Sequence, residues 1–385
     1  MYIPGGGYRD GSGNVPVYNG ENLAKKGLVV VTINYRVGVF GFFANPELTA
    51  ESEHHASGNY GLMDPVAALE WIRDNIGVFG GDPESVTIMG QSAGAMSVHG
   101  LIVSPLASGL FARAIAQSGS RVNLGPGMDL ASAERAGEKF AKDIGAASLA
   151  ELRAIPAREL LDFAYDHYTF RPIVDGWFLP QNVDEIVAVG EQNDVPMLTG
   201  FVADEGSYGD DYGKVPMDEF RKQIKQQTGA LADKILELYP AETQSQCDES
   251  QVAYTRDMTL VSMYLWARNS EKTGKSDIYT YLFTHQQPGP TQERYKAFHS
   301  SELPYVFDNL DPSYRPWTAQ DTLIAGTTSS YWVNFIKTGN PNGEGLPAWP
   351  SFNEAPQEIM ELGDTMGPRP IASGEKIDVL IKLLQ

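Results

Sequence analysis

The chain has 385 residues, with 49 acidic and 29 basic side chains, so its formal charge at pH 7 is −20. A field of that sign repels polyanions, and no local cluster of Lys and Arg offsets it, which excludes nucleic acid as a partner. A hydrophobic share of 42% with 20% charged residues is typical of a globular protein. Length predicts one large domain or two.

Cysteine content excludes a disulfide scaffold, because Cys247 is the only cysteine in the chain. It lies in an acidic stretch that we expect to be a loop, which also disfavours a zinc or iron–sulfur site. The longest apolar run, at 28–33, has the length of a strand and is far too short for a membrane span. We therefore expect a soluble protein.

The chain begins with MYIPGGGY, which lacks the basic and apolar regions of a secretory signal. It reads as the end of a strand followed by a glycine loop. A start inside an element predicts that the N-terminal part of the domain is missing, and any signal peptide would lie upstream of Met1. We expect lower stability and a disturbed glycine loop, because the first strand would have an unpaired edge.

Strands and helices alternate in the first part of the chain. The apolar, β-branched segment at 27–36 predicts a strand buried on both faces of a parallel sheet. Apolar residues at three- and four-residue steps predict a helix over 62–76. Strands are expected at 85–89 and 112–117, with a helix beginning at Ala93. The alternation predicts a doubly wound α/β fold with a mostly parallel sheet.

The middle of the chain is more helical. Helices are predicted at 131–144, 149–165, 217–239 and 252–269, and a strand at 196–202. The later elements are strands at 278–283 and 359–362 and helices at 321–337 and 376–384. We expect a single domain over 1–385 whose helical insertions, at about 130–190 and 210–272, form a cap.

The segment Gly90-Gln91-Ser92-Ala93-Gly94 lies between a predicted strand and a predicted helix. Glycines at these offsets allow a sharp turn in which the serine is strained and its hydroxyl is exposed above the sheet. A serine hydroxyl is nearly unreactive at its free pKa and needs a neighbouring base. Ser92 is therefore a candidate nucleophile.

The base must come from six histidines. Sites of this kind present serine, then acid, then histidine along the chain. That order leaves His285 and His299, because the other four precede the late strands. His285 continues the strand at 278–283 and is expected to be packed, whereas His299 lies in a loop beyond it. We prefer His299.

The carboxylate that orients the imidazole is expected after the strand at 196–202. Asp204 and Glu205 both lie there, and their spacing does not separate them. Backbone N–H groups are needed to hold the developing oxyanion. The loop Gly5-Gly6-Gly7 can supply those of Gly6 and Gly7, and Ala93 supplies a third.

These segments together resemble the type-B carboxylesterases, the family that includes cholinesterases and bacterial p-nitrobenzyl esterases. The resemblance covers nearly the whole chain. Its matches are PGGGY at 4–8, NYRVGVFGF at 34–42, GNYGLMD at 58–64, FGGDPESVTIMGQSAG at 79–94, AIAQSGS at 114–120, RPIVDGWFLP at 171–180, GFVADEGSYG at 200–209 and FHSSELPYVF at 298–307.

The resemblance implies an α/β-hydrolase fold and hydrolysis of small-molecule carboxylic esters through an acyl-enzyme, without a metal or organic cofactor. It assigns the catalytic triad to Ser92, Glu205 and His299. It also implies that Ser118 is a buried serine beside the triad, and that Arg36 and Asp64 form a buried structural ion pair.

Several positions depart from the family pattern. Pro4 removes a backbone donor just before the glycine loop. Gln91 replaces the usual glutamate, which weakens the case for a cationic choline ester. The acyl-pocket tryptophan position falls near Gly125, and Tyr168 is expected to line the same pocket, so we expect an open acyl side that admits bulky groups.

A second interpretation is a non-catalytic cholinesterase-like binding protein, since the same fold also serves in adhesion, or an inactive truncated esterase. Loss of a triad residue would favour it, and all three residues are present. The lone cysteine makes the chain more similar to disulfide-poor bacterial esterases than to disulfide-bonded secreted animal ones.

Overall fold

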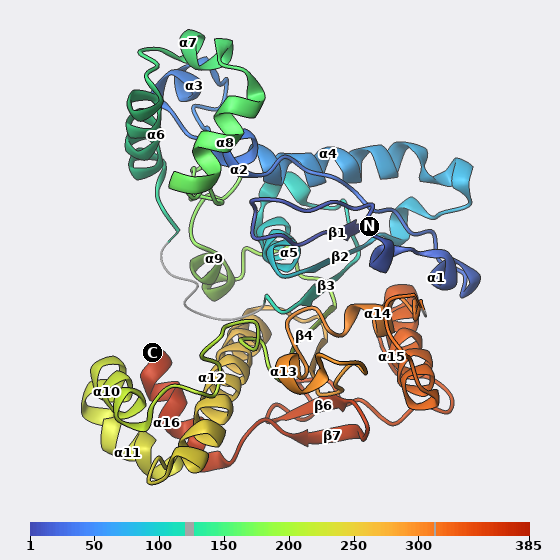
Figure 1. Cartoon of the computed structure of the whole chain (residues 1–385). Coiled ribbons are helices and arrows are strands. Elements are labelled where there is room, and N and C mark those ends of the chain that lie inside the picture. The colour runs from blue at the N-terminus through green and yellow to red at the C-terminus, as the bar shows by residue number, and fades with distance from the viewer. Residues whose placement is uncertain (120–126, 312) are drawn as a thin grey trace. The chain divides into compact units, whose positions relative to one another are not determined.

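The computed structural model describes residues 1–119, 127–311 and 313–385 (Figure 1). These residues form two compact units that interleave along the chain. The first contains residues 1–15, 29–116 and 127–195, and the second contains residues 16–28, 117–119 and 196–385. The sequence-based expectation of a single domain stays a prediction.

The strands of the first unit are β1 (Tyr2–Ile3), β2 (Thr87–Gln91) and β3 (Arg113–Gln117), in that order across the sheet. β1 pairs in parallel with β2, and Tyr2 lies opposite Met89. On its other side the Tyr2 N–H donates to the Val31 carbonyl at 2.7 Å, and the Tyr2 carbonyl accepts from the Ile33 N–H at 3.3 Å. The expectation of an unpaired edge at β1 is therefore wrong.

The segment at 27–36 is not the doubly buried strand that its composition predicts. Among the described residues its only bridge joins Thr32 to Tyr2, and Val29 is 43% exposed. Thr32, Asn34 and Arg36 are exposed while Ile33 is buried, so one face of this stretch is open to solvent. A continuous apolar run does not reveal how many neighbours a strand has.

Helices flank these strands. α5 (Ala93–Val103) is buried along almost its entire length and contacts β1, β2 and α4 (Tyr60–Asn75). The remaining helices of this unit are α2 (Gly38–Phe42), α3 (Pro46–Glu51), α6 (Leu130–Ile144), α7 (Leu149–Ala154), α8 (Ala157–His167) and α9 (Val183–Val189). The predicted helix at 149–165 is two helices, because Pro156 lacks the N–H that a continuous helix needs.

The second unit contains β4 (Met197–Val202), β5 (Ile278–Phe283), β6 (Glu358–Leu362) and β7 (Met366–Pro370). β4, β5 and β6 run parallel, with Val202 opposite Phe283 and Phe283 opposite Leu362. β7 pairs antiparallel with β6 and was not predicted, because its sequence MGPRP lacks strand-forming residues. Two prolines are compatible with a strand only at an edge.

The helices of the second unit are α1 (Glu21–Lys25), α10 (Met217–Thr228), α11 (Ala232–Leu238), α12 (Gln244–Thr273), α13 (Gln292–Tyr295), α14 (Leu303–Val306), α15 (Ala319–Thr338) and α16 (Gly374–Leu384). α10, α11, α12 and α16 contact one another in a helical group, seen in Figure 1 around the C-terminus. α14 packs on α15. Helices thus occupy both segments expected as insertions.

Two expectations about this group were wrong. The predicted helix at 217–239 breaks at Gly229, whose φ of +54° ends α10. Cys247 is not in a loop: it is buried in the first turns of α12, which begins after Thr243, where the threonine side chain accepts from the Gln246 N–H at 3.3 Å. Polar residues at a helix start resemble a loop in the sequence.

Among the described residues, none of the helices has the length and apolar character needed to cross a membrane.

We predict that Trp349→Ala lowers the free energy of unfolding by about 3–5 kcal/mol, because it leaves a large cavity. Trp349 is 1% exposed, and its Nε1–H donates to the Thr280 carbonyl at 3.1 Å. Trp71→Ala is the matched control: Trp71 is 49% exposed, and we expect a loss below about 1 kcal/mol. Urea unfolding of both variants tests this, and an equal or larger loss for Trp71→Ala would contradict it.

Candidate active site

Ser92 lies in the sharp turn between β2 and α5. Its φ of +59° and ψ of −123° are strained for a residue with a side chain. Position 94 must be glycine because the backbone of β1 passes close to it: a Cβ on Gly94 would lie 2.0 Å from the Ile3 carbonyl oxygen. The turn therefore has the strand, serine and helix order of a nucleophile elbow, and β1 ends against it.

The glycine loop after β1 lies beside this turn. A Cβ on Gly5 would fall 3.1 Å from the Ser92 Cβ and 2.8 Å from the Gln91 carbonyl oxygen, so only glycine allows the approach. Gln91 itself is buried at the end of β2. The Gly6 carbonyl accepts the N–H groups of Arg9 and Asp10 at 3.0 and 3.2 Å, which closes the loop.

Two side chains anchor the glycine loop. Tyr8 is 1% exposed, packs edge-on against Phe42 and receives a hydrogen bond from the Ser97 hydroxyl at 3.3 Å. Arg9 lies over the ring of Tyr165 in α8, with 4.2 Å from its guanidinium carbon to the ring centre, and donates to the Tyr165 carbonyl at 2.9 Å. The loop is thus tied to the core and to α8.

The second unit contains a carboxylate–imidazole pair. Glu205 follows β4, and its Oε2 lies 2.5 Å from the Nδ1 of His299. Its Oε1 accepts the Ser118 hydroxyl at 2.6 Å and the Val202 N–H at 3.0 Å. A carboxylate oxygen accepts hydrogen bonds, so this contact is satisfied when Nδ1 carries the hydrogen, which leaves Nε2 as the nitrogen that can accept a proton. The side chains of His299 and Glu205 are 30% and 19% exposed.

Asp204, the alternative that the sequence left open, has different partners. It is 7% exposed, its Oδ1 accepts the Tyr212 hydroxyl at 3.2 Å, and its Oδ2 accepts the Ala297 N–H at 3.2 Å. Asp204 also forms a backbone bridge with Phe298, the residue before His299. Asp204 therefore holds the histidine loop in place, while Glu205 contacts the imidazole.

His285 is packed, as its strand position predicts. Its Nδ1 lies 2.9 Å from Asp364 and its Nε2 lies 2.9 Å from Asp321, so both ring nitrogens face carboxylates. His99 is buried in α5, and burial lowers its pKa to about 4. His299 is the histidine whose Nδ1 bonds to Glu205.

A buried polar network under the pair was missed in the sequence. Glu302, at the start of α14, is 0% exposed, and its Oε1 accepts the Gln117 Nε2–H at 3.2 Å. Gln117 precedes Ser118, which contacts Glu205. The sequence did carry a signal, because Glu302 is a charged residue between Ser301 and the apolar segment LPYVF, only three residues after His299.

Burial raises the pKa of the Glu302 carboxyl from its ordinary value of 4.5 to about 7, with a further rise from the negative charge of Glu205. The hydrogen bond from Gln117 and the charge of His299 oppose this rise. Removing water disfavours the charged form of a carboxyl group. Glu302 thus keeps its proton at pH values where an exposed glutamate is ionised.

The other predicted residues fall in several places. The Ser118 backbone has a φ of +56°, and its N–H donates to the Gly200 carbonyl at 2.8 Å. Tyr168 packs on Phe140 and donates a hydrogen bond from its hydroxyl to Asp143, so its described contacts are structural.

Arg36 and Asp64 form the expected ion pair, at 2.6 Å, but the Arg36 side chain is 51% exposed and the pair is not buried. Gly125 lies outside the described residues.

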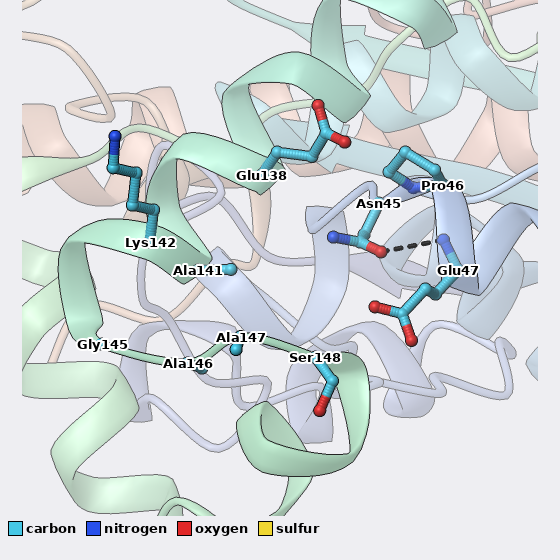
Figure 2. A pocket seen from close by; sticks show the side chains of 10 residues that line it. All are labelled: Asn45, Pro46, Glu47, Glu138, Ala141, Lys142, Gly145, Ala146, Ala147 and Ser148. Carbon is cyan, nitrogen blue, oxygen red and sulfur yellow. Dashed lines mark hydrogen bonds between the residues drawn. The ribbon is translucent and has the colours of Figure 1, made fainter.

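A pocket of about 490 Å³ opens in the first unit between the start of α3 and the end of α6 (Figure 2). The Asn45 side chain accepts the Glu47 N–H there at 2.9 Å. Its one hydroxyl group, on Ser148, accepts the Glu151 N–H at 3.2 Å and caps α7. No histidine is among its lining residues, so this pocket lacks a base for serine chemistry.

A strained serine between a strand and a helix, with a carboxylate–histidine pair after later strands, is characteristic of α/β-hydrolases. Comparison with known proteins leads to the same class. Residues 1–376 match the model of the Carboxylesterase family. Fumonisin B1 esterase of Sphingopyxis macrogoltabida is 35% identical over 98% of this chain and 71% of its own length.

Para-nitrobenzyl esterase of Bacillus subtilis (strain 168) is 33% identical over 94% of this chain and 75% of its own length. A solved structure of a PNB esterase is similar at a TM-score of 0.81 and 31% identity, over 98% of this chain and 79% of that one. The chain belongs to the Carboxylesterase family. It has the α/β-hydrolase fold and is a carboxylic ester hydrolase.

The raised pKa of Glu302 predicts how stability changes with pH. Between pH 4.5 and about 7 the folded chain keeps a proton on Glu302 that the unfolded chain releases, so folding stability from this group is lost as pH rises. Glu302→Gln has no such titration. The unfolding free energy of Glu302→Gln, relative to that of the wild type, should therefore rise by about 2 to 3 kcal/mol between about pH 5 and about pH 8.

Urea unfolding at both pH values measures this difference. Glu354→Gln, which removes an exposed carboxylate, is the control and should show almost no change with pH. A Glu302→Gln difference that is the same at both pH values would contradict the assignment.

Proposed function

We propose that the chain hydrolyses small-molecule carboxylic esters with Ser92 as nucleophile, His299 as general base and Glu205 as the carboxylate that orients the imidazole. The observation that carries this assignment is the 2.5 Å contact between Glu205 Oε2 and His299 Nδ1, together with the strained turn at Ser92. Membership of the Carboxylesterase family supports the same reaction class.

In the proposed acylation step, His299 Nε2 removes the proton from the Ser92 hydroxyl as the oxygen attacks the ester carbonyl. The Nδ1–H stays hydrogen-bonded to Glu205, which stabilises the imidazolium that forms. The imidazolium then donates its proton to the leaving alkoxide, and the alcohol departs. Water repeats the sequence on the acyl-enzyme and releases the acid.

The proposed oxyanion hole is formed by the backbone N–H groups of Gly6, Gly7 and Ala93. Its support is the position of the glycine loop, since Gly5 packs directly against Ser92. Donors fixed before the reaction stabilise the developing charge at little reorganisation cost. The anchors at Tyr8 and Arg9 hold this loop, so they contribute to that preorganisation.

The proposed substrates are uncharged esters. Gln91 is neutral where a glutamate would attract a cation, and it is buried next to the nucleophile. Esters with a p-nitrophenyl leaving group fit this class and allow direct measurement of turnover.

We predict that Ser92→Ala lowers kcat for p-nitrophenyl acetate by at least about 10⁴-fold, because no other group can form the acyl-enzyme. The wild type should release a burst of p-nitrophenol equal to the enzyme concentration, and the variant should release none. Ser108→Ala, at an exposed serine, is the control and should retain full activity. Substantial turnover by Ser92→Ala would refute the proposal.

A second prediction separates the two adjacent carboxylates. Glu205→Gln should reduce kcat by about 10³- to 10⁴-fold with little change in KM, because the imidazolium loses its stabilising charge. In Asp204→Asn the amide oxygen can still accept the Ala297 N–H of the histidine loop. We therefore expect less than a tenfold loss of kcat. The reverse order of the two effects would show that the proposed acid is the wrong residue.

A further inference from the structure

A continuous series of contacts joins Glu302 to the carboxylate–imidazole pair. Glu302 Oε1 accepts from Gln117 at 3.2 Å, the next residue Ser118 donates to Glu205 at 2.6 Å, and Glu205 contacts His299 at 2.5 Å. Glu302 is also three residues from His299 in the same loop. Any change in charge at Glu302 therefore occurs beside the groups proposed for proton transfer.

The surroundings of Glu302 strongly disfavour a negative charge. The residue is 0% exposed, and its Oε2 has no hydrogen-bond partner within the described part of the chain. The titratable groups that interact with it are Glu205 after β4, His299 in its own loop and Tyr281 in β5. Two of these three are acids, and an ionised Glu205 already carries the negative charge that His299 needs.

We propose that Glu302 is a positioning residue that holds a proton beneath the Glu205–His299 pair, and that release of this proton changes the pH at which His299 acts as a base. The proposal rests on the function proposed for His299 and Glu205. While Glu302 is neutral, the pair has one carboxylate beside one imidazole. When Glu302 ionises, a second negative charge faces the imidazole and favours its protonated form.

The direction of the effect follows from this charge. Ionised Glu302 makes the imidazolium harder to deprotonate, so the base form of His299 appears at higher pH than it would beside a neutral group. The two groups titrate as a coupled pair, since each proton affects the other. Burial raises the pKa of the Glu302 carboxyl to about 7, so it ionises near neutral pH.

The first test compares the pH dependence of kcat/KM for p-nitrophenyl acetate in the wild type, Glu302→Gln and Glu354→Gln. Glutamine has nearly the same shape as glutamate but stays neutral. We expect the acid limb of the Glu302→Gln profile to move to lower pH than that of the wild type, with KM changed less than about twofold. Glu354→Gln should match the wild type, because that carboxylate is exposed.

The second test detects the proton without any turnover. Infrared difference spectra of the wild type between about pH 5.5 and about pH 8.5 should show loss of a carboxylic acid carbonyl band, because the pKa of Glu302 is about 7. The band should be absent from Glu302→Gln. If that variant does not fold, Gln117→Met makes the same test, because removing the donor to the carboxylate should raise the titration midpoint of the band.

The results decide the proposal in each case. A Glu302→Gln profile that superimposes on the wild type would overturn it, as would a wild type with no titrating acid band near neutral pH. A folded wild type that turns over no ester would refute the proposed function, and the infrared titration would still show whether Glu302 holds a proton.

Discussion

In the proposed mechanism, the hydrogen bond between Glu205 and His299 is the interaction on which the chemistry of this chain depends. It fixes the imidazole tautomer, so that Nε2 can take a proton. The surrounding hydrogen bonds keep the two side chains in place. The Ser118 hydroxyl and the Val202 N–H donate to Glu205, and Asp204 accepts the Ala297 N–H of the histidine loop. Glu205 and Asp204 directly follow β4. A small shift at the end of that strand would therefore misplace both the Glu205 carboxylate and, through Asp204, the loop that carries His299.

The role proposed for Glu302 gives a physical reason for a costly buried group beside this pair. A buried carboxyl without full hydrogen bonding reduces stability once it ionises, and an apolar residue of similar size would avoid that cost. Glu302 nevertheless lies where its charge can act on His299 through space and on Glu205 through Gln117 and Ser118. Stability and the control of proton transfer thus place opposite demands on one residue, as is frequent at functional sites.

Much of the fold and the site could be predicted from local sequence patterns. The turn at Ser92 follows from glycine spacing, and β5 and α4 follow from apolar periodicity, because these signals depend only on neighbouring residues. The choice between Asp204 and Glu205 depends on which side chain meets a histidine almost a hundred positions later, so spacing could not make it. The partly exposed segment at 27–36 was misjudged and the buried Glu302 was missed for the same reason, since burial is set by partners from distant parts of the chain.

The most direct test of the central claim is the rate at which an organophosphonate labels Ser92, followed by mass spectrometry of the peptide that contains it. Phosphonylation requires a serine activated by a correctly oriented histidine, and it does not depend on the choice of ester. The account predicts one adduct, on Ser92, and labelling that is slower by orders of magnitude in Glu205→Gln. No adduct on Ser92 in the wild type, or equal labelling rates in the two proteins, would contradict it.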